Sequence, residues 1–107
     1  MIHCITNYVT AGDTANMLLA AGASPIMADD PSESAEITAL AQGLTLNLGT
    51  PSGSRVEAML RSGAEANRCG IPVVFDPVGA GCSGFRRNSA GEILRRVRLT
   101  AIRGNLS

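Results

Sequence analysis

Residues 76–81, Asp-Pro-Val-Gly-Ala-Gly, carry the pattern with the most chemical content in this sequence. Asp76 follows the apolar run 73–75, which reads as a buried strand, and Gly79 and Gly81 lie in the turn that comes next. Glycine has no Cβ, so the backbone at such a turn can approach a ligand closely. Ligands of open α/β sheets bind at the carboxyl ends of the strands. The pattern therefore predicts a binding or catalytic site around Asp76.

The other strand ends would meet at the same edge of a parallel sheet. Asp76 could hold Mg²⁺ directly or through water, because this ion takes few protein carboxylates. The planar guanidinium of Arg103 could donate two parallel hydrogen bonds to a phosphate. A cleft that holds a carboxylate, a metal ion and an arginine favours phosphoryl transfer, which depends on positioning and on neutralisation of charge. The residues predicted at this edge are Asn7, Met27, Asp29, Asp30, Gly49, Asp76, Gly79, Gly81, Arg103 and Asn105.

Each of these residues also has a purely structural interpretation. Asp76 could begin a turn together with the proline that follows it. Arg103 could be a surface arginine with an ion-pair partner, and Met27 could fill a gap in the core. Asp29 and Asp30 are interpreted as serving the start of a helix, without a chemical role. The residues alone leave these alternatives open.

The single histidine and the three cysteines form no recognisable site. His3 and Cys4 are adjacent in a predicted strand, so their side chains point to opposite faces, and packing is the preferred role of both. Cys4, Cys69 and Cys82 are widely spaced and include no CxxC pair. That spacing fits a reducing cytosol better than a disulfide framework or a zinc site. Neither a GxGxxG nor a Walker-type pattern is present.

Alternating strands and helices are predicted to position these residues. Asp30 and Glu33 predict an N-cap and a capping box, and Ser54 predicts the cap of the next helix. The order predicts one α/β domain with a parallel sheet, right-handed crossovers and helices on both faces, a Rossmann-like three-layer arrangement. Strands are predicted at residues 2–5, 25–28, 44–48, 73–76 and 101–103, and helices at 13–21, 31–42, 55–69 and 89–97.

Composition argues against several classes of partner. The 107 residues fit one small domain, and 45% of them are apolar, enough for a core. The formal net charge of zero gives no sign of the excess of basic residues with which proteins bind nucleic acid or an anionic membrane. No signal peptide is visible, and no stretch approaches the roughly 20 apolar residues of a membrane helix. We expect a cytoplasmic protein with neither nucleic acid nor membrane as a partner.

Four segments in order along the chain resemble hydroxyethylthiazole kinases: residues 3–10 (HCITNYVT), 22–29 (GASPIMAD), 76–81 (DPVGAG) and 102–105 (IRGN). The resemblance spans essentially the whole chain and implies a ribokinase-like fold. It implies transfer of the ATP γ-phosphate to the hydroxyl of 4-methyl-5-(2-hydroxyethyl)thiazole, with Mg²⁺, in thiamine biosynthesis and salvage. It further implies a homotrimer whose thiazole pockets lie between subunits.

The resemblance also implies roles for single residues. Met27 matches the methionine that binds the thiazole, with Asn7 and Val9 beside it. Arg103 matches the arginine that contacts ATP, and Asp76 matches the acidic residue near magnesium. These roles agree with the predicted edge of the sheet, but the substrate follows from the resemblance alone.

The catalytic segment of the family is expected beyond Ser107. It consists of a Gly-x-Gly-Cys anion hole and an acidic residue just after Ser107. Residues 79–82 imitate the anion hole, but they stand in the DPVGAG loop, so we transfer no catalytic role to Cys82 or to any other residue of 1–107. Both ends of the chain read as cut. We expect the N-terminal portion of a single ribokinase-like kinase domain, inactive alone.

Two alternatives remain open. The first is a ribokinase-like kinase for another small alcohol, such as a hydroxymethylpyrimidine, which Met27 mildly disfavours. The second is a non-catalytic α/β module for binding or oligomerisation, which predicts binding without turnover. In isolation its last strand would be an uncovered sheet edge, so poor solubility is expected.

Overall fold

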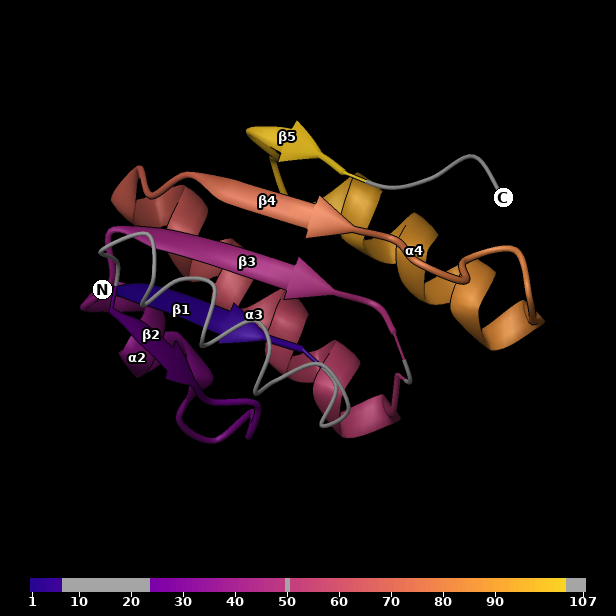
Figure 1. Ribbon diagram of the computed structural model, residues 1–107, viewed down its shortest axis with the longest axis horizontal. Helices are drawn as coiled ribbons and strands as arrows, with labels where there is room; N and C mark the ends of the chain where they lie inside the picture. The colour runs from indigo at the N-terminus through magenta and orange to yellow at the C-terminus, as the bar shows by residue number, and fades with distance from the viewer. Residues whose placement is uncertain (7–23, 50, 104–107) are drawn as a thin grey trace.

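Five parallel strands form one sheet in the part of the chain that the computed structural model describes, residues 1–6, 24–49 and 51–103. The strand order is β2-β1-β3-β4-β5 (Figure 1). The predicted parallel α/β sheet is confirmed, and each strand boundary lies within one residue of its predicted place. The strands are β1 (Ile2–Ile5), β2 (Pro25–Met27), β3 (Gly43–Asn47), β4 (Val73–Asp76) and β5 (Ala101–Ile102).

Three helices cover one face of this sheet (Figure 1): α2 (Ser34–Ala39), α3 (Gly53–Cys69) and α4 (Gly84–Arg96). Each joins a strand to one further along the sheet in the same direction, and each crossover is right-handed, as twisted parallel sheets require. The predicted helix 13–21 lies outside the described residues. A helical layer on the second face therefore stays a prediction.

The core lies between the sheet and these helices. Strand side chains alternate between the two faces, and the alternate residues Leu44, Leu46 and Phe75 are almost fully buried against α3. Burial of such apolar area is the main favourable term in folding. The remaining buried members of this cluster are Ile5, Leu48, Val56, Ala58, Met59, Ala66, Val73, Ala90, Ile93 and Val97.

Helix α2 is shorter than predicted at both ends. The Asp30 carboxylate accepts hydrogen bonds from the backbone N–H and the hydroxyl of Ser32, at 2.9 and 2.8 Å, but these bonds hold a turn that precedes the helix. The N-cap is Glu33, without a side-chain capping bond, so the predicted capping box is wrong. At the other end the Gln42 N–H donates to the Met1 carbonyl, which directs the chain into β3.

Helix α3 begins earlier than predicted, and the cap is Ser52 instead of Ser54. The Ser52 side chain accepts a hydrogen bond from the Arg55 N–H at 3.1 Å, in an extended backbone conformation suited to an N-cap. The helix ends as predicted at Cys69, because Gly70 adopts a left-handed conformation with φ 73°.

Helix α4 starts five residues before the predicted Ser89. Ser83 caps it by accepting from the Arg86 N–H at 3.1 Å. The first turn contains Gly84 and two arginines and has little apolar periodicity, so the hydrophobic pattern does not reveal it.

Candidate functional site

Three polar residues lie at the carboxyl ends of three neighbouring strands: Asn47 ends β3, Asp76 ends β4, and Arg103 follows β5. Asp76 is the last residue of β4 and lies opposite Asn47, the last residue of β3. Arg103 follows β5 directly, and its N–H donates to the Phe75 carbonyl at 2.8 Å. That bond continues the β4–β5 pairing of Phe75 with Ile102 and places Arg103 beside Asp76.

These three residues also share a face of the sheet. Leu46, Phe75 and Ile102 precede them, and Leu46 and Phe75 lie in the core beneath the helices. Because strand side chains alternate, the next residue of each strand projects from the opposite face. A carboxylate, an amide and a guanidinium therefore project from adjacent strand ends on the face turned away from α2, α3 and α4.

Met27 lies on the same face at the opposite side of the sheet. It pairs in register with Cys4, whose neighbour His3 contacts α2, so Met27 and Cys4 both project away from the helices. Its side chain is 39% exposed. At a strand spacing of about 4.8 Å, Met27 is roughly 14 Å across the strands from Asp76. Asn7 and Val9 lie outside the described residues.

The Asp76 carboxylate has the character of a metal ligand. Its Oδ1 atom is buried and has no hydrogen-bond partner in the described ranges. A buried carboxylate oxygen without a partner is costly, so such an atom indicates a ligand or a water. The described residues contain no group of three or more His, Cys, Asp or Glu side chains placed for a metal. A single carboxylate beside neutral oxygens fits Mg²⁺, which keeps several of its waters.

The loop after Asp76 requires glycine at position 79. Gly79 has φ +71°, which L side chains rarely adopt, and a Cβ there would collide with the Arg86 guanidinium. The loop consists of two successive turns. The Ala80 N–H donates to the Pro77 carbonyl in the first turn, and the Cys82 N–H donates to the Gly79 carbonyl in the second, each at 3.0 Å. A side chain of α4 therefore lies close to the backbone at Gly79, and the close approach of a ligand to this loop stays a prediction.

Asn47 was missed by the sequence reasoning, although a signal was present. Asn47 ends a strand two residues before Gly49, much as Asp76 ends a strand three residues before Gly79. The Asn47 side chain accepts a hydrogen bond from the Gly49 N–H at 2.7 Å and so shapes that loop. The two polar strand ends become neighbours only through the register of β3 with β4.

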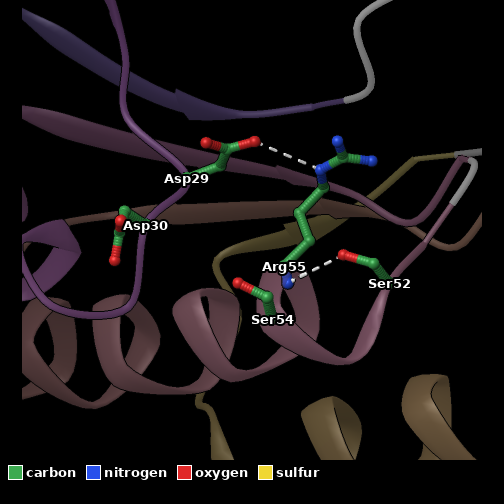
Figure 2. A pocket seen from close by; sticks show the side chains of 5 residues that line it. All are labelled: Asp29, Asp30, Ser52, Ser54 and Arg55. Atoms are coloured by element: carbon green, nitrogen blue, oxygen red, sulfur yellow. Dashed lines mark hydrogen bonds and ion pairs between the residues drawn. The ribbon is translucent and has the colours of Figure 1, made fainter.

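A polar pocket of about 230 Å³ lies beside the ends of β2 and β3 (Figure 2). The buried Arg55 side chain donates from Nε to Asp29 Oδ2 at 3.3 Å across it. Asp29, which the sequence assigned to the start of a helix, is instead the partner of this arginine. The residues are 26 positions apart, so no local pattern reveals the pair. The pocket is lined by Asp29, Asp30, Ser52, Ser54 and Arg55.

His3 is buried in a hydrogen-bonded position, as the packing interpretation predicts. Its Nε2 donates to the Ala28 carbonyl at 2.8 Å, and its Nδ1 lies 2.8 Å from the Thr38 hydroxyl. Burial lowers the pKa of His3, while the bond to Ala28 and the nearby Glu33 oppose that effect. Neutral imidazole, with its proton on Nε2, is the form that this environment favours.

The cysteines are free thiols in different surroundings. Cys4 is 1% exposed, and burial raises the pKa of its thiol. Cys69 is exposed, and a hydrogen bond with Glu65 raises the pKa of its thiol. Cys82 is exposed in the loop before α4.

No helix within residues 1–6, 24–49 and 51–103 is long and apolar enough to cross a membrane.

Comparison with known proteins gives one consistent family. A sequence model of the hydroxyethylthiazole kinase family matches residues 1–107. A hydroxyethylthiazole kinase of Clostridium beijerinckii is 52% identical over the whole chain, and one of Desulfovibrio desulfuricans is 55% identical. The chain spans 39% and 38% of their lengths.

Solved structures agree on the fold. The structure of a hydroxyethylthiazole kinase protein from Pyrococcus horikoshii OT3 matches with a TM-score of 0.93 and 42% identity, over 98% of this chain and 41% of that one. A sensor histidine kinase receiver domain from Pseudomonas aeruginosa matches 99% of this chain and 84% of its own, with a TM-score of 0.66 and 15% identity. The latter likeness shows a shared fold alone. The chain belongs to the hydroxyethylthiazole kinase family.

Proposed function

We propose that the full-length protein containing this chain phosphorylates the hydroxyl of 4-methyl-5-(2-hydroxyethyl)thiazole with ATP, in thiamine biosynthesis or salvage. The observation that carries the proposal is the family match over all 107 residues. The geometry supports it, because Asp76 and Arg103 end neighbouring strands on the same face.

The reaction is a single displacement at phosphorus. The alcohol oxygen bonds to the γ-phosphorus, the bond from that phosphorus to the bridging oxygen breaks, and ADP departs with the bond electrons. Arg103 would bind phosphate oxygens, and Asp76 would hold Mg²⁺ through Oδ1, which has no hydrogen-bond partner among the residues that the structure describes. When bound, Mg²⁺ supplies neutralisation of phosphate charge. The hydroxyl proton must pass to a base, a role we assign to no residue of 1–107.

Met27, with Asn7 and Val9, is proposed to bind the thiazole ring. The thioether is soft and polarisable and projects from the end of β2 with 39% of its surface exposed, which suits contact with a flat sulfur-containing ring. The ring would then lie on the same face of the sheet as Asp76.

A homotrimer with thiazole pockets between subunits is part of the proposal. Its support is the family match over residues 1–107. Light scattering of the full-length protein tests the trimer. The free cysteines support a cytoplasmic location.

Turnover by the purified full-length protein tests the activity. With ATP, Mg²⁺ and the thiazole alcohol we expect ADP and the thiazole phosphate, and we expect neither from residues 1–107 alone. A hydroxymethylpyrimidine offered in competition should be phosphorylated more slowly. A folded full-length protein that binds the thiazole alcohol or ATP but forms no ADP would instead indicate a binding module.

Replacing Asp76 by asparagine tests the metal ligand. We expect Asp76→Asn to lower kcat about 100-fold, because charge stabilisation of the transferring phosphate is among the largest catalytic terms. Glu92→Gln removes one negative charge from an exposed ion pair of α4 and serves as the control with unchanged activity. If Asp76→Asn retained wild-type kcat at limiting Mg²⁺, the assignment of Asp76 would be wrong.

A further inference from the structure

Arg55 and Asp29 form an ion pair to which the proposed function gives no role. Arg55 lies in the first turn of α3 and is 9% exposed, and its Nε donates to Asp29 Oδ2 at 3.3 Å. Figure 2 shows the arginine side chain extending from the helix toward the loop that carries Asp29. The Arg55 side chain is 10% exposed and that of Asp29 is 32% exposed, so solvent screens this pair less than a fully exposed one.

The pair joins the loop after β2 to the first turn of α3, and the two strands that lead into these segments are not neighbours in the sheet. Asp29 follows β2, Arg55 follows β3, and β1 lies between these strands. Two strand spacings, about 10 Å, separate β2 from β3, a gap that needs a side chain as long as arginine. After β1 the chain forms β2 on one side of β1 and then β3 on the other side, so the strand order reverses at β1. Ligands of open α/β sheets bind where the strand order reverses in this way. The ion pair therefore spans the carboxyl end of β1 beside that reversal.

The position of Asp29 constrains the end of β2. Met27 is two residues away, and two extended residues reach at most about 7 Å. On the other side of Asp29, the bonds from Ser32 hold Asp30 in its turn. Asp29 is thus held through its side chain by Arg55 and through the backbone by the Asp30 turn, and its position limits where the end of β2 that carries Met27 can lie.

We propose that Arg55 is a positioning residue for the alcohol substrate. Through Asp29 it holds the end of β2, and with it Met27, at a fixed distance from the loop after β3. The inference rests on the proposed function, because it assigns Met27 to the substrate pocket. In this role Arg55 acts through Asp29 and not by contact with the alcohol or the phosphate.

Steady-state kinetics of the full-length protein test this role. We expect Arg55→Met and Asp29→Asn each to raise KM for the thiazole alcohol about tenfold while KM for ATP stays within about twofold, because only one wall of the site moves. The double variant should be no worse than Arg55→Met alone, since that variant already lacks the contact with Asp29. Arg96→Met, which removes an exposed ion pair with Glu92 in α4, should change neither KM.

The outcomes separate the two proposals. If the wild-type protein turns over the alcohol but Asp29→Asn and Arg55→Met leave its KM unchanged, the positioning role is wrong and the activity stands. Equal rises in both KM values would also contradict it, because they indicate a general structural effect. If Arg55→Met fails to fold, Asp29→Asn, a nearly isosteric change in a loop, decides alone. A wild-type protein without turnover refutes the proposed function itself.

Discussion

At the scale of single residues, His3 shows how burial selects a protonation state. The Thr38 hydroxyl lies 2.8 Å from His3 Nδ1 and 3.0 Å from the Ser34 carbonyl, yet it carries a single hydrogen. It can therefore satisfy only one of two acceptors while the imidazole is neutral. Burial nevertheless outweighs the hydrogen bonds and lowers the pKa of His3.

This lowered pKa predicts a loss of stability in mild acid. The unfolded chain takes up a proton at His3 near the ordinary pKa of 6.5, whereas the folded chain does so only at lower pH. Between these two values the unfolded state binds more protons, so the free energy of unfolding falls as pH drops below about 6.5. Urea denaturation at pH 7.5 and 5.5 measures the difference.

His3→Gln supplies the control, because its amide can still donate to Ala28 but does not titrate. The decline from pH 7.5 to 5.5 should be smaller in the His3→Gln protein than in the wild type. Equal declines in both proteins would show that other groups cause the effect.

At the scale of elements, the packing of α3 against α4 depends on one glycine. A Cβ at Gly63 would lie 2.5 Å from Val97 Cγ2, and Val97 is the buried C-cap of α4. Gly91 in α4 differs, because its Cβ would meet only the far end of the Arg95 side chain, at 3.3 Å. Both glycines lie inside helices, but only Gly63 is needed for close contact between them.

The same substitution should therefore have opposite effects at the two positions. Gly91→Ala should stabilise by up to about 1 kcal/mol, since alanine is the better helix former. Gly63→Ala should destabilise by about 1–2 kcal/mol, because overpacking against Val97 exceeds that gain. Chemical denaturation of each variant measures the free energy of unfolding. Stabilisation by Gly63→Ala would show that α4 moves away without cost.

The strands were predictable from sequence because each is a short apolar run between turn residues. Helix boundaries were harder to predict, because a helix start depends on which serine side chain accepts a hydrogen bond from a backbone N–H of the first turn. Ser52 and Ser54 are equally plausible caps from the sequence, and in the structure the cap is Ser52. For the site, strand-end chemistry marked Asp76, Met27 and Arg103. The partnership of Asp29 with Arg55 was hidden, since it forms only when β2 and β3 flank β1.

At the scale of the whole molecule, β5 is an edge strand of the sheet that the described residues leave uncovered. Ile102 of β5 is 60% exposed and Leu94 of α4 is 50% exposed, and a groove of about 430 Å³ lies beside them. Edge strands with exposed apolar side chains pair readily with other chains. In the relatives, the segment matched by this chain is under two fifths of the length.

Residues 1–107 expressed alone should consequently self-associate through β5. We expect Ile102→Lys to reduce the associated fraction measured by light scattering, because a charge on an edge strand opposes pairing. Leu40, the C-cap of α2, is also apolar and is 70% exposed, so Leu40→Lys serves as the control and should leave association unchanged. Equal effects of the two variants would contradict a role for the β5 edge.

The three free thiols form a graded reporter of opening. Thiolates react with alkylating reagents and thiols do not, so access and pKa together set the rate. Cys82 should be labelled readily, Cys69 more slowly because of its hydrogen bond with Glu65, and Cys4 only when the structure around β1 opens. Mass spectrometry after timed alkylation would thus follow the opening of β1 without an added probe.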